Sequence, residues 1–174
     1  MKDGWKYVGL FAVALGVAAG YFALHECGHA LATVAVGGKV AEIHWFWQPH
    51  VASDLFGVGQ AGVVAVGLGG LAFPWWITRM VRPRRFWMWY AVWITEWIVL
   101  WSFALSLITA LFPSTGLSTD MQQVLAVWPR GKTLFAIFSG SAIWFTWRSI
   151  VQAQPLGRIA AYFHISLKKA GAVF

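Results

Sequence analysis

The stretch YVGLFAVALGVAAGYFALHECGHALATVAV (residues 7–36) decides how this chain folds. It is almost entirely apolar, and it is longer than the about 20 residues with which an α-helix crosses a hydrocarbon core. Its charged and imidazole side chains, His25, Glu26 and His29, all lie within five consecutive positions. Residues 7–36 therefore predict a membrane-spanning helix with a polar cluster in its second half.

The composition of the whole chain indicates the same environment. Of the 174 residues, 59% are hydrophobic and only 11% are charged, whereas a soluble domain carries about 25% charged residues. Three more apolar stretches long enough to cross a bilayer follow, at residues 59–80, 86–112 and 133–151. The sequence thus predicts an all-α integral membrane protein with about four transmembrane helices. Residues 1–154 would form one transmembrane domain, and residues 155–174 an amphipathic tail on the cytoplasmic surface or a simple charged tail.

The basic residues predict the orientation of the chain in the membrane. Four spans place both termini on one side, and that side has ten of the 13 Lys and Arg side chains. Because basic residues are retained on the cytoplasmic side, both termini are predicted to be cytoplasmic. The net charge of +7 then reflects orientation and contact with anionic lipid headgroups, and nucleic acid is not an expected partner. A single cysteine, Cys27, excludes an intramolecular disulfide framework.

The connection between the first two apolar stretches, residues 38–55, has no helical pattern. From Val40 to Gln48 its side chains alternate between two faces, and Pro49 closes the run. Alternation with a period of two is typical of a β-strand. The sequence therefore predicts a short strand-like or re-entrant segment directly after the first helix.

The residues His25-Glu26-Cys27-Gly28-His29 fit the pattern HExxH. On an α-helix, residues four apart lie on the same face, so both imidazoles can bind one metal ion. Glu26 is next to them, where a carboxylate can accept a proton from a water molecule on the metal. A lone polar side chain inside a helical bundle is usually structural, but each of these three costs about 2.5–3.5 kcal/mol in an apolar helix unless it is satisfied. The cluster therefore favours a metal site, with Zn²⁺ as the expected cofactor.

A catalytic zinc ion usually has three protein ligands, so a ligand beyond the two histidines is needed. Asp120 lies in the connection between the third and fourth apolar stretches, at the same expected depth as the histidines. We therefore expect it to be the third ligand, with helix capping as its alternative role. Glu96, inside the third apolar stretch, is the second candidate. Weaker candidates lie between the first two stretches: His44, His50 and Asp54.

Several of these segments together resemble the site-2 protease family of intramembrane zinc metalloproteases, especially its short members. The resemblance rests on HECGHALATVAVGG (residues 25–38), on the strand-like segment that follows, on the Gly-rich second span and on STDMQQVL (residues 118–125). These segments cover about two thirds of the chain. The resemblance implies that His25, His29 and Asp120 bind zinc and that Glu26 is the general base.

The resemblance also implies a role for the strand-like segment. In the family, the strand after the motif helix pairs with an unwound segment of the substrate, which is a form of edge addition to a sheet. Transferred to this chain, that role places Val40, Glu42 and His44 in substrate binding.

Three features depart from the pattern of the family. Its second span often contains Gly-Pro-x-x-Asn, whereas this chain has Gly67-Leu68-Gly69-Gly70-Leu71, so no polar residue is assigned to stabilise the transition state. Asp120 does not have the common Leu-Asp-Gly context. Many members also have their active site toward the cytoplasm, while the charge distribution here places it toward the outer face.

Two functions therefore remain open. The first is an intramembrane zinc metalloprotease that hydrolyses a peptide bond in or next to the membrane, with a membrane-protein or membrane-adjacent peptide as substrate. The second is a catalytically silent, protease-like scaffold subunit of a larger membrane complex, which the missing second-span motif favours.

The small and aromatic residues of the spans have structural interpretations. Ala61, Ala65 and Gly69 are four residues apart, which predicts a face for close helix packing in lipid. Many tryptophans lie near the ends of the apolar stretches and are expected to form an aromatic belt at the membrane interface. These are Trp5, Trp45, Trp47, Trp75, Trp76, Trp87, Trp89 and Trp128.

Overall fold

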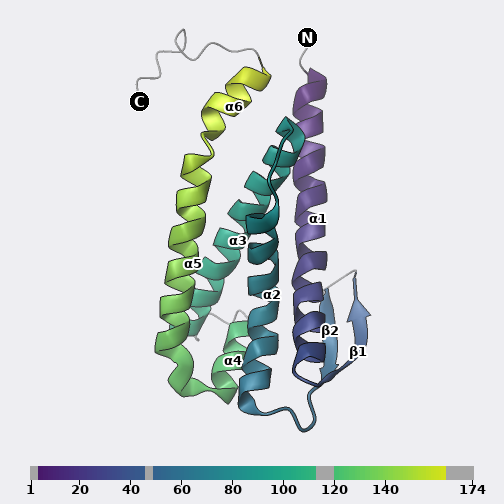
Figure 1. Cartoon of the computed structure of the whole chain (residues 1–174), viewed down its shortest axis with the longest axis vertical. Helices are drawn as coiled ribbons and strands as arrows, with labels where there is room; N and C mark the ends of the chain where they lie inside the picture. The colour runs from purple at the N-terminus through teal and green to yellow at the C-terminus, as the bar shows by residue number, and fades with distance from the viewer. Residues whose placement is uncertain (1–3, 46–48, 113–119, 164–174) are drawn as a thin grey trace.

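The structure is a computed structural model that describes residues 4–45, 49–112 and 120–163 (Figure 1). In chain order the elements are α1 (Gly4–Ala35), β1 (Lys39–His44), β2 (His50–Asp54), α2 (Gln60–Met80), α3 (Phe86–Leu111), α4 (Asp120–Val127), the 3-10 helix η2 (Pro129–Gly131), α5 (Lys132–Gln152) and α6 (Pro155–Tyr162). Predictions that concern residues 118–119, the end of the tail at 164–174 and Trp47 lie outside the described residues.

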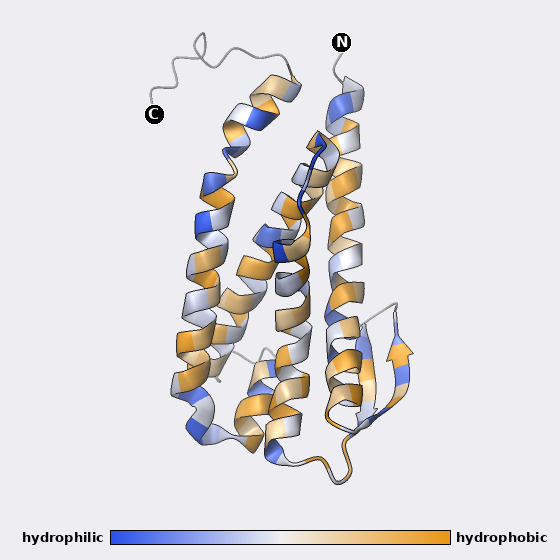
Figure 2. Ribbon diagram, in the orientation of Figure 1, coloured by the Kyte–Doolittle hydropathy of each residue, from blue (hydrophilic) through white to orange (hydrophobic). Residues whose placement is uncertain are grey.

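Four helical segments are long and apolar enough to cross a membrane by length and composition: Gly4–Ala35, Gln60–Met80, Phe86–Leu111 and Pro129–Tyr162. This confirms the predicted number of apolar helices and the helical fold class. The long helices are largely apolar along their length, and hydrophilic residues gather in the connection between α2 and α3 (Figure 2). Large apolar side chains also cover the outside of the bundle, and Phe11, Trp101 and Trp144 are each more than 60% exposed. Such a surface suits a lipid environment.

The segment after α1 forms a hairpin of two strands, whereas the alternation predicted one strand as far as Gln48. β1 and β2 pair antiparallel, from Lys39 opposite Asp54 to His44 opposite His50. A register irregularity between Val40 and Glu42 interrupts the alternation. The hairpin lies beside the second half of α1 (Figure 1), where the hydroxyl oxygens of Thr33 and Ser53 are 2.8 Å apart. β2 thus lies against α1, at the depth of the HExxH residues.

Helices α1 and α2 touch through their backbones at Gly28 and Gly69. A Cβ atom on Gly28 would overlap the carbonyl group of Gly69, and a Cβ atom on Gly69 would lie 2.6 Å from the carbonyl oxygen of Gly28. Only glycine at both positions permits this approach. The small-residue face predicted for the second span is therefore used, at Gly69, against the helix that carries the motif.

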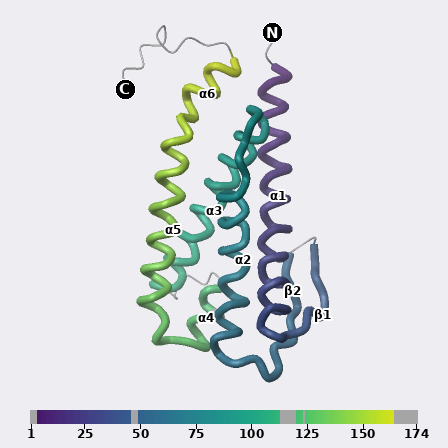
Figure 3. The backbone as a smooth tube through the Cα atoms, viewed as in Figure 1, coloured from purple at the N-terminus to yellow at the C-terminus, as the bar shows by residue number. Residues whose placement is uncertain are grey.

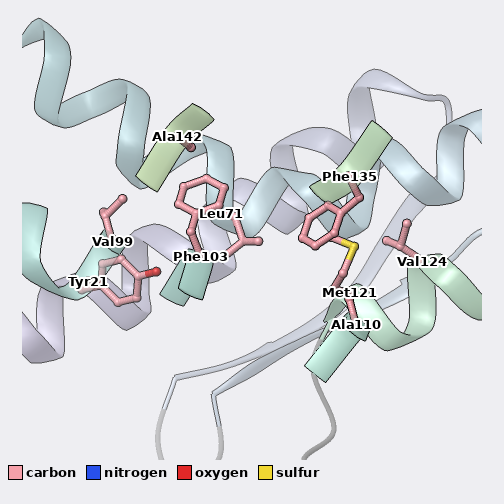
Figure 4. Packing of buried hydrophobic residues seen from close by; sticks show 9 residues of the cluster. All are labelled: Tyr21, Leu71, Val99, Phe103, Ala110, Met121, Val124, Phe135 and Ala142. Atoms are coloured by element: carbon pink, nitrogen blue, oxygen red, sulfur yellow. The ribbon is translucent and has the colours of Figure 1, made fainter. Parts of the chain in front are cut away.

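The buried hydrophobic cluster joins all the long helices and α4 (Figure 4). Tyr21 of α1 packs near Val99 of α3 and donates a 2.7 Å hydrogen bond to the hydroxyl of Ser102. Met121 of α4 is completely buried and lies next to Phe135 of α5. The short helix α4 lies beside the first half of α2 (Figure 3), so it is part of the bundle and not a peripheral loop.

The first part of the predicted tail continues beyond α5 as α6 and contacts the starts of α1 and α3 (Figure 1). The ring of Tyr162 stacks on Phe86 at 4.1 Å, and Lys6 donates a hydrogen bond to the carbonyl oxygen of Tyr162. Both ends of the described chain therefore lie at the same end of the bundle (Figure 1). The guanidinium of Arg158 lies over the indole ring of Trp89, which is only 4% exposed. The prediction that Trp89 belongs to an interfacial belt is therefore wrong, because the bundle and α6 bury it.

The close contact between α1 and α2 can be tested with Gly28→Ala. The added Cβ would lie 2.7 Å from the carbonyl carbon of Gly69 and 2.9 Å from Cβ of Phe73, so the helices must separate. We expect the free energy of unfolding to fall by about 1–3 kcal/mol, the usual cost of overpacking. Thermal unfolding in detergent measures this change. Gly20→Ala on the same helix, where nothing lies within 4 Å, should be neutral or slightly stabilising; equal stability of the two variants would contradict the contact.

Candidate metal centre

His25 and His29 lie one turn apart on α1, and their rings face the same point. Their Nε2 atoms are 3.1 Å apart, and the ring planes are nearly perpendicular, with centroids 4.7 Å apart. His29 is buried, and its Nδ1 lies 2.8 Å from the carbonyl oxygen of Val66 on α2. The i, i+4 spacing on the helix therefore places two imidazole nitrogens together, as the sequence predicted.

Asp120 completes this group from the first residue of α4. Its Oδ2 atom lies 3.0 Å from Nε2 of His25 and 3.1 Å from Nε2 of His29. The three ligand atoms form a triangle with sides of 3.0–3.1 Å. Of the described residues, these three are the group of His, Cys, Asp and Glu side chains close enough to hold one metal ion. The predicted partnership of Asp120 with the two histidines is thus present in the structure.

Hydrogen bonding around His29 shows that a proton or a metal ion must lie within the triangle. The carbonyl oxygen of Val66 has no proton to give, so Nδ1 of His29 donates to it. In a neutral imidazole, Nε2 of His29 then carries a lone pair, which points at the carboxylate of Asp120 and at Nε2 of His25. Three such atoms within 3.1 Å repel one another unless a proton or a metal ion lies among them.

The dimensions of the triangle fit zinc. With Zn–N and Zn–O distances of about 2.0–2.1 Å and tetrahedral angles, neighbouring ligand atoms lie about 3.3–3.4 Å apart. The observed sides are a few tenths of an ångström shorter. The bond from His29 to Val66 is the kind of outer contact that orients a metal-binding imidazole. Nδ1 of His25, in contrast, is buried without a partner among the described residues.

The protonation of Asp120 also suits a cation site. Burial alone would raise the pKa of its carboxyl group, but the hydrogen bonds with His25 and His29 outweigh burial and hold the pKa well below its ordinary value. The side chain is therefore an anion near neutral pH, which is the state a metal ligand requires.

Helix α2 supplies the space for the two imidazoles at Gly70. A Cβ atom at this position would overlap Nε2 of His29 and would lie 2.8 Å from Cε1 of His25. Gly67, one turn earlier, lets α4 approach, because a Cβ there would overlap the side chain of Val124. Sequence reasoning favoured packing as the role of this Gly-rich stretch. The structure shows that part of this packing is against the candidate ligands themselves.

Glu26 lies at the wall of a cavity of about 230 Å³ next to the triangle. Its side chain is only 5% exposed, and His29 and Asp120 line the same cavity. The opposite wall includes Val51 and Ser53 of β2. Glu26, the predicted general base, is therefore buried and lines a cavity that is large enough for a small group.

The other candidate ligands lie elsewhere. Glu96 accepts hydrogen bonds from Ser149 at 2.7 Å and from Arg79 at 3.2 Å, so it is a paired carboxylate of the bundle and not part of the triangle. The ring of His44 stacks on that of His50 on the hairpin, 4.3 Å away. These two histidines and Asp54 are not in the group that could share a metal with His25 and His29.

The residues predicted to bind substrate, Val40, Glu42 and His44, lie on β1. Glu42 and His44 form an ion pair with each other at 3.2 Å. The strand that lines the cavity is β2, through Val51 and Ser53. Sequence reasoning missed β2 because this strand has only five residues, too few for a clear alternation. The role of β1 in substrate binding stays a prediction.

Comparisons with known proteins give no relative from which a function could be transferred. No protein-family profile, no curated protein and no solved structure matches the chain. The chemistry of the site must therefore be inferred from its own residues.

The role of Gly70 gives a direct test of the site. In Gly70→Ala the added methyl group must push the imidazoles of His25 and His29 away from Asp120. We expect the affinity for zinc to fall by about 10- to 100-fold, as for the loss of other groups that orient ligands. Competition with a zinc chelator measures the affinity. Gly140→Ala on α5, with nothing within 4 Å, is the matched control and should bind zinc like the unaltered protein; unchanged affinity in both variants would contradict the role of Gly70.

Proposed function

We propose that this protein is an intramembrane zinc metalloprotease of the site-2 protease type. The observation that carries the proposal is the meeting of His25, His29 and Asp120 on one face of an apolar bundle, with Glu26 beside them on a buried cavity. Each of the four is a residue type that such chemistry requires. Their positions along the chain, on α1 and α4, are those that the resemblance implies.

In the proposed hydrolysis of a peptide bond, different residues of the chain would have different roles. His25, His29 and Asp120 would hold the metal ion, which supplies Lewis-acid polarisation of the substrate carbonyl and a water of lowered pKa when it is bound. Glu26 would accept the proton of the attacking water and deliver it to the nitrogen of the leaving amine. Val66 would keep His29 in the tautomer whose Nε2 faces the metal.

The substrate would be an extended segment of a membrane protein or of a peptide next to the membrane. A peptide in an α-helix has its carbonyl groups hydrogen-bonded within the helix, so it must unwind before a carbonyl can be attacked. The hairpin is suited to hold such a segment, because an extended peptide can add to a strand. Val51 and Ser53 would then contact it where β2 lines the cavity.

The proposed orientation has both termini in the cytoplasm. The start of α1 and the end of α6 lie at one end of the bundle, together with the basic connection between α2 and α3 (Figure 2). Because basic residues are retained in the cytoplasm, the metal site lies toward the outer face of the membrane.

The decisive test of function is Glu26→Gln, which keeps the size of the side chain and removes its basicity. We expect this variant to bind zinc like the unaltered protein and to cleave about 10²- to 10⁴-fold more slowly, the usual contribution of a general base. Zinc content by atomic spectrometry and cleavage of a fluorogenic library of apolar peptides in vesicles would measure the two effects.

Glu96→Gln is the matched control, because it makes the same change at the other buried glutamate, away from the cavity at Glu26. It should keep both zinc and cleavage. Cleavage by Glu26→Gln at the rate of the unaltered protein would contradict the proposed role. Zinc binding without cleavage of any peptide by the unaltered protein would instead favour the scaffold subunit.

A further inference from the structure

A second cavity, of about 350 Å³, lies at the other end of the bundle from the metal centre. It opens between the end of α2, the start of α3, the end of α5 and α6. Its lining is rich in hydrogen-bond donors and in positive charge. The residues that matter are Arg79, Trp89, Trp93, Glu96, Gln152 and Arg158.

The charges of this cavity do not balance. Arg79 pairs with Glu96, and its other terminal nitrogen donates to the hydroxyl of Thr146 at 3.3 Å. Arg158 lies 5.2 Å above the ring of Trp89, a contact that holds its guanidinium at the cavity but leaves its N–H donors unused by that ring. Of the carboxylates among the described residues, Glu96 alone lines this cavity. One guanidinium charge is therefore left without a counter-ion in the lining.

Two indole rings form part of the wall of this cavity. Trp89 is 4% exposed, and Trp89 and Trp93 both line the cavity. Their Nε1 atoms are buried away from solvent, so the rings offer a ligand apolar surface and not hydrogen-bond donors. The donors of the cavity are therefore its guanidinium groups.

An apolar groove shares one lining residue, Trp93, with this cavity. It has a volume of about 610 Å³ and runs between α3, α5 and the start of α6. Trp93 lines both the cavity and the groove, and Trp97, Trp147, Val151 and Leu156 line the groove alone. A donor-rich, positive head and an adjoining apolar channel correspond to the two parts of a phospholipid.

We propose that the cavity binds the phosphate-bearing head of an anionic phospholipid, with one acyl chain in the groove. Arg158 and the free N–H groups of Arg79 would donate to the phosphate oxygens, as guanidinium groups do in other phosphate sites. Basic pockets between membrane helices on the cytoplasmic side are suited to such headgroups. The site is separate from the metal centre, and it does not depend on proteolysis.

Two ligands could bring a phosphate group to the cavity, a free phosphate ion and a phospholipid, and the apolar groove distinguishes between them. A free phosphate ion would use the donors but would leave the groove of Trp97, Trp147 and Leu156 without a partner. A phospholipid uses both, and its chain covers apolar surface that is otherwise open. The lipid is therefore the occupant that the structure favours.

Binding can be measured by native mass spectrometry of the full chain, released from nanodiscs of mixed phosphatidylglycerol and phosphatidylcholine. We expect phosphatidylglycerol to remain bound in preference to phosphatidylcholine. Arg158→Gln should weaken its retention about tenfold, because a hydrogen bond to a charged group is lost. Arg148→Gln is the control, since it removes the same charge from an exposed position of α5 that does not line the cavity.

Three results would overturn the proposal. Equal retention of the two lipids would show that no anionic site exists. An equal loss in Arg158→Gln and Arg148→Gln would show that only the overall surface charge matters. Thermal stabilisation by inorganic phosphate alone as large as that by phosphatidylglycerol would show a site for the free anion and not for a lipid. Thermal unfolding of each variant in detergent reports whether it has folded.

Discussion

The contact between the backbones of Gly28 and Gly69 is the constraint on which the rest of the structure depends. It sets the distance and the rotation of α1 against α2, and the histidines lie directly beside it on α1. Because the two helices are so close, the ring of His29 reaches the carbonyl of Val66, and both imidazoles fit over Gly70. Asp120 then reaches the same point because Gly67 admits α4 to the other side of α2. A bulkier residue at any of these glycines would separate groups that must lie about 3 Å apart to share one ion.

The described part of the bundle contains two buried clusters that include carboxylates, and their charges are compensated in different ways. Arg79 and Glu96 neutralise each other, and Ser149 and Thr146 satisfy further hydrogen bonds of this pair. In the triangle of His25, His29 and Asp120, the carboxylate meets two imidazole nitrogens, and a proton or a metal ion must lie among them. A polar cluster inside an apolar bundle that lacks its own counter-charge is a sign of a binding site. This contrast is why we propose a metal for the triangle, while Glu96 is satisfied by its ion pair with Arg79.

The features that could be predicted from the sequence are those that depend on spacing within one helix. The apolar length of α1 and the four-residue step from His25 to His29 need no tertiary information. Asp120 could be predicted as their partner because it was the one carboxylate expected at the same depth in the outer connection. The structure places Asp120 with the two histidines, and its role as a metal ligand stays a prediction.

Features that depend on how helices rotate or bend could not be predicted. Gly70 faces the imidazoles because of how α2 is rotated about its own axis, so that a Cβ atom there would overlap them. No pattern in a Gly-rich stretch predicts this rotation. Trp89 is buried partly because Arg158 of α6 covers its ring, and α6 follows a bend at Gln154, a residue with a left-handed backbone (φ 48°) just before Pro155. The pairing of Arg79 with Glu96 joins two helices and has no signal in their separate sequences.

The amide variants of the two candidate carboxylate ligands test the central claim most directly. Asp120→Asn and Glu96→Gln each remove one negative charge at nearly constant volume, so zinc stoichiometry in the two purified proteins can be compared with that of the unaltered chain. If the proposal is right, we expect equimolar zinc in the unaltered protein and in Glu96→Gln, and a loss of zinc in Asp120→Asn, because of the described carboxylates only Asp120 lies with the two histidines. Full zinc occupancy in Asp120→Asn, or loss of zinc in Glu96→Gln alone, would contradict the assignment of the metal centre.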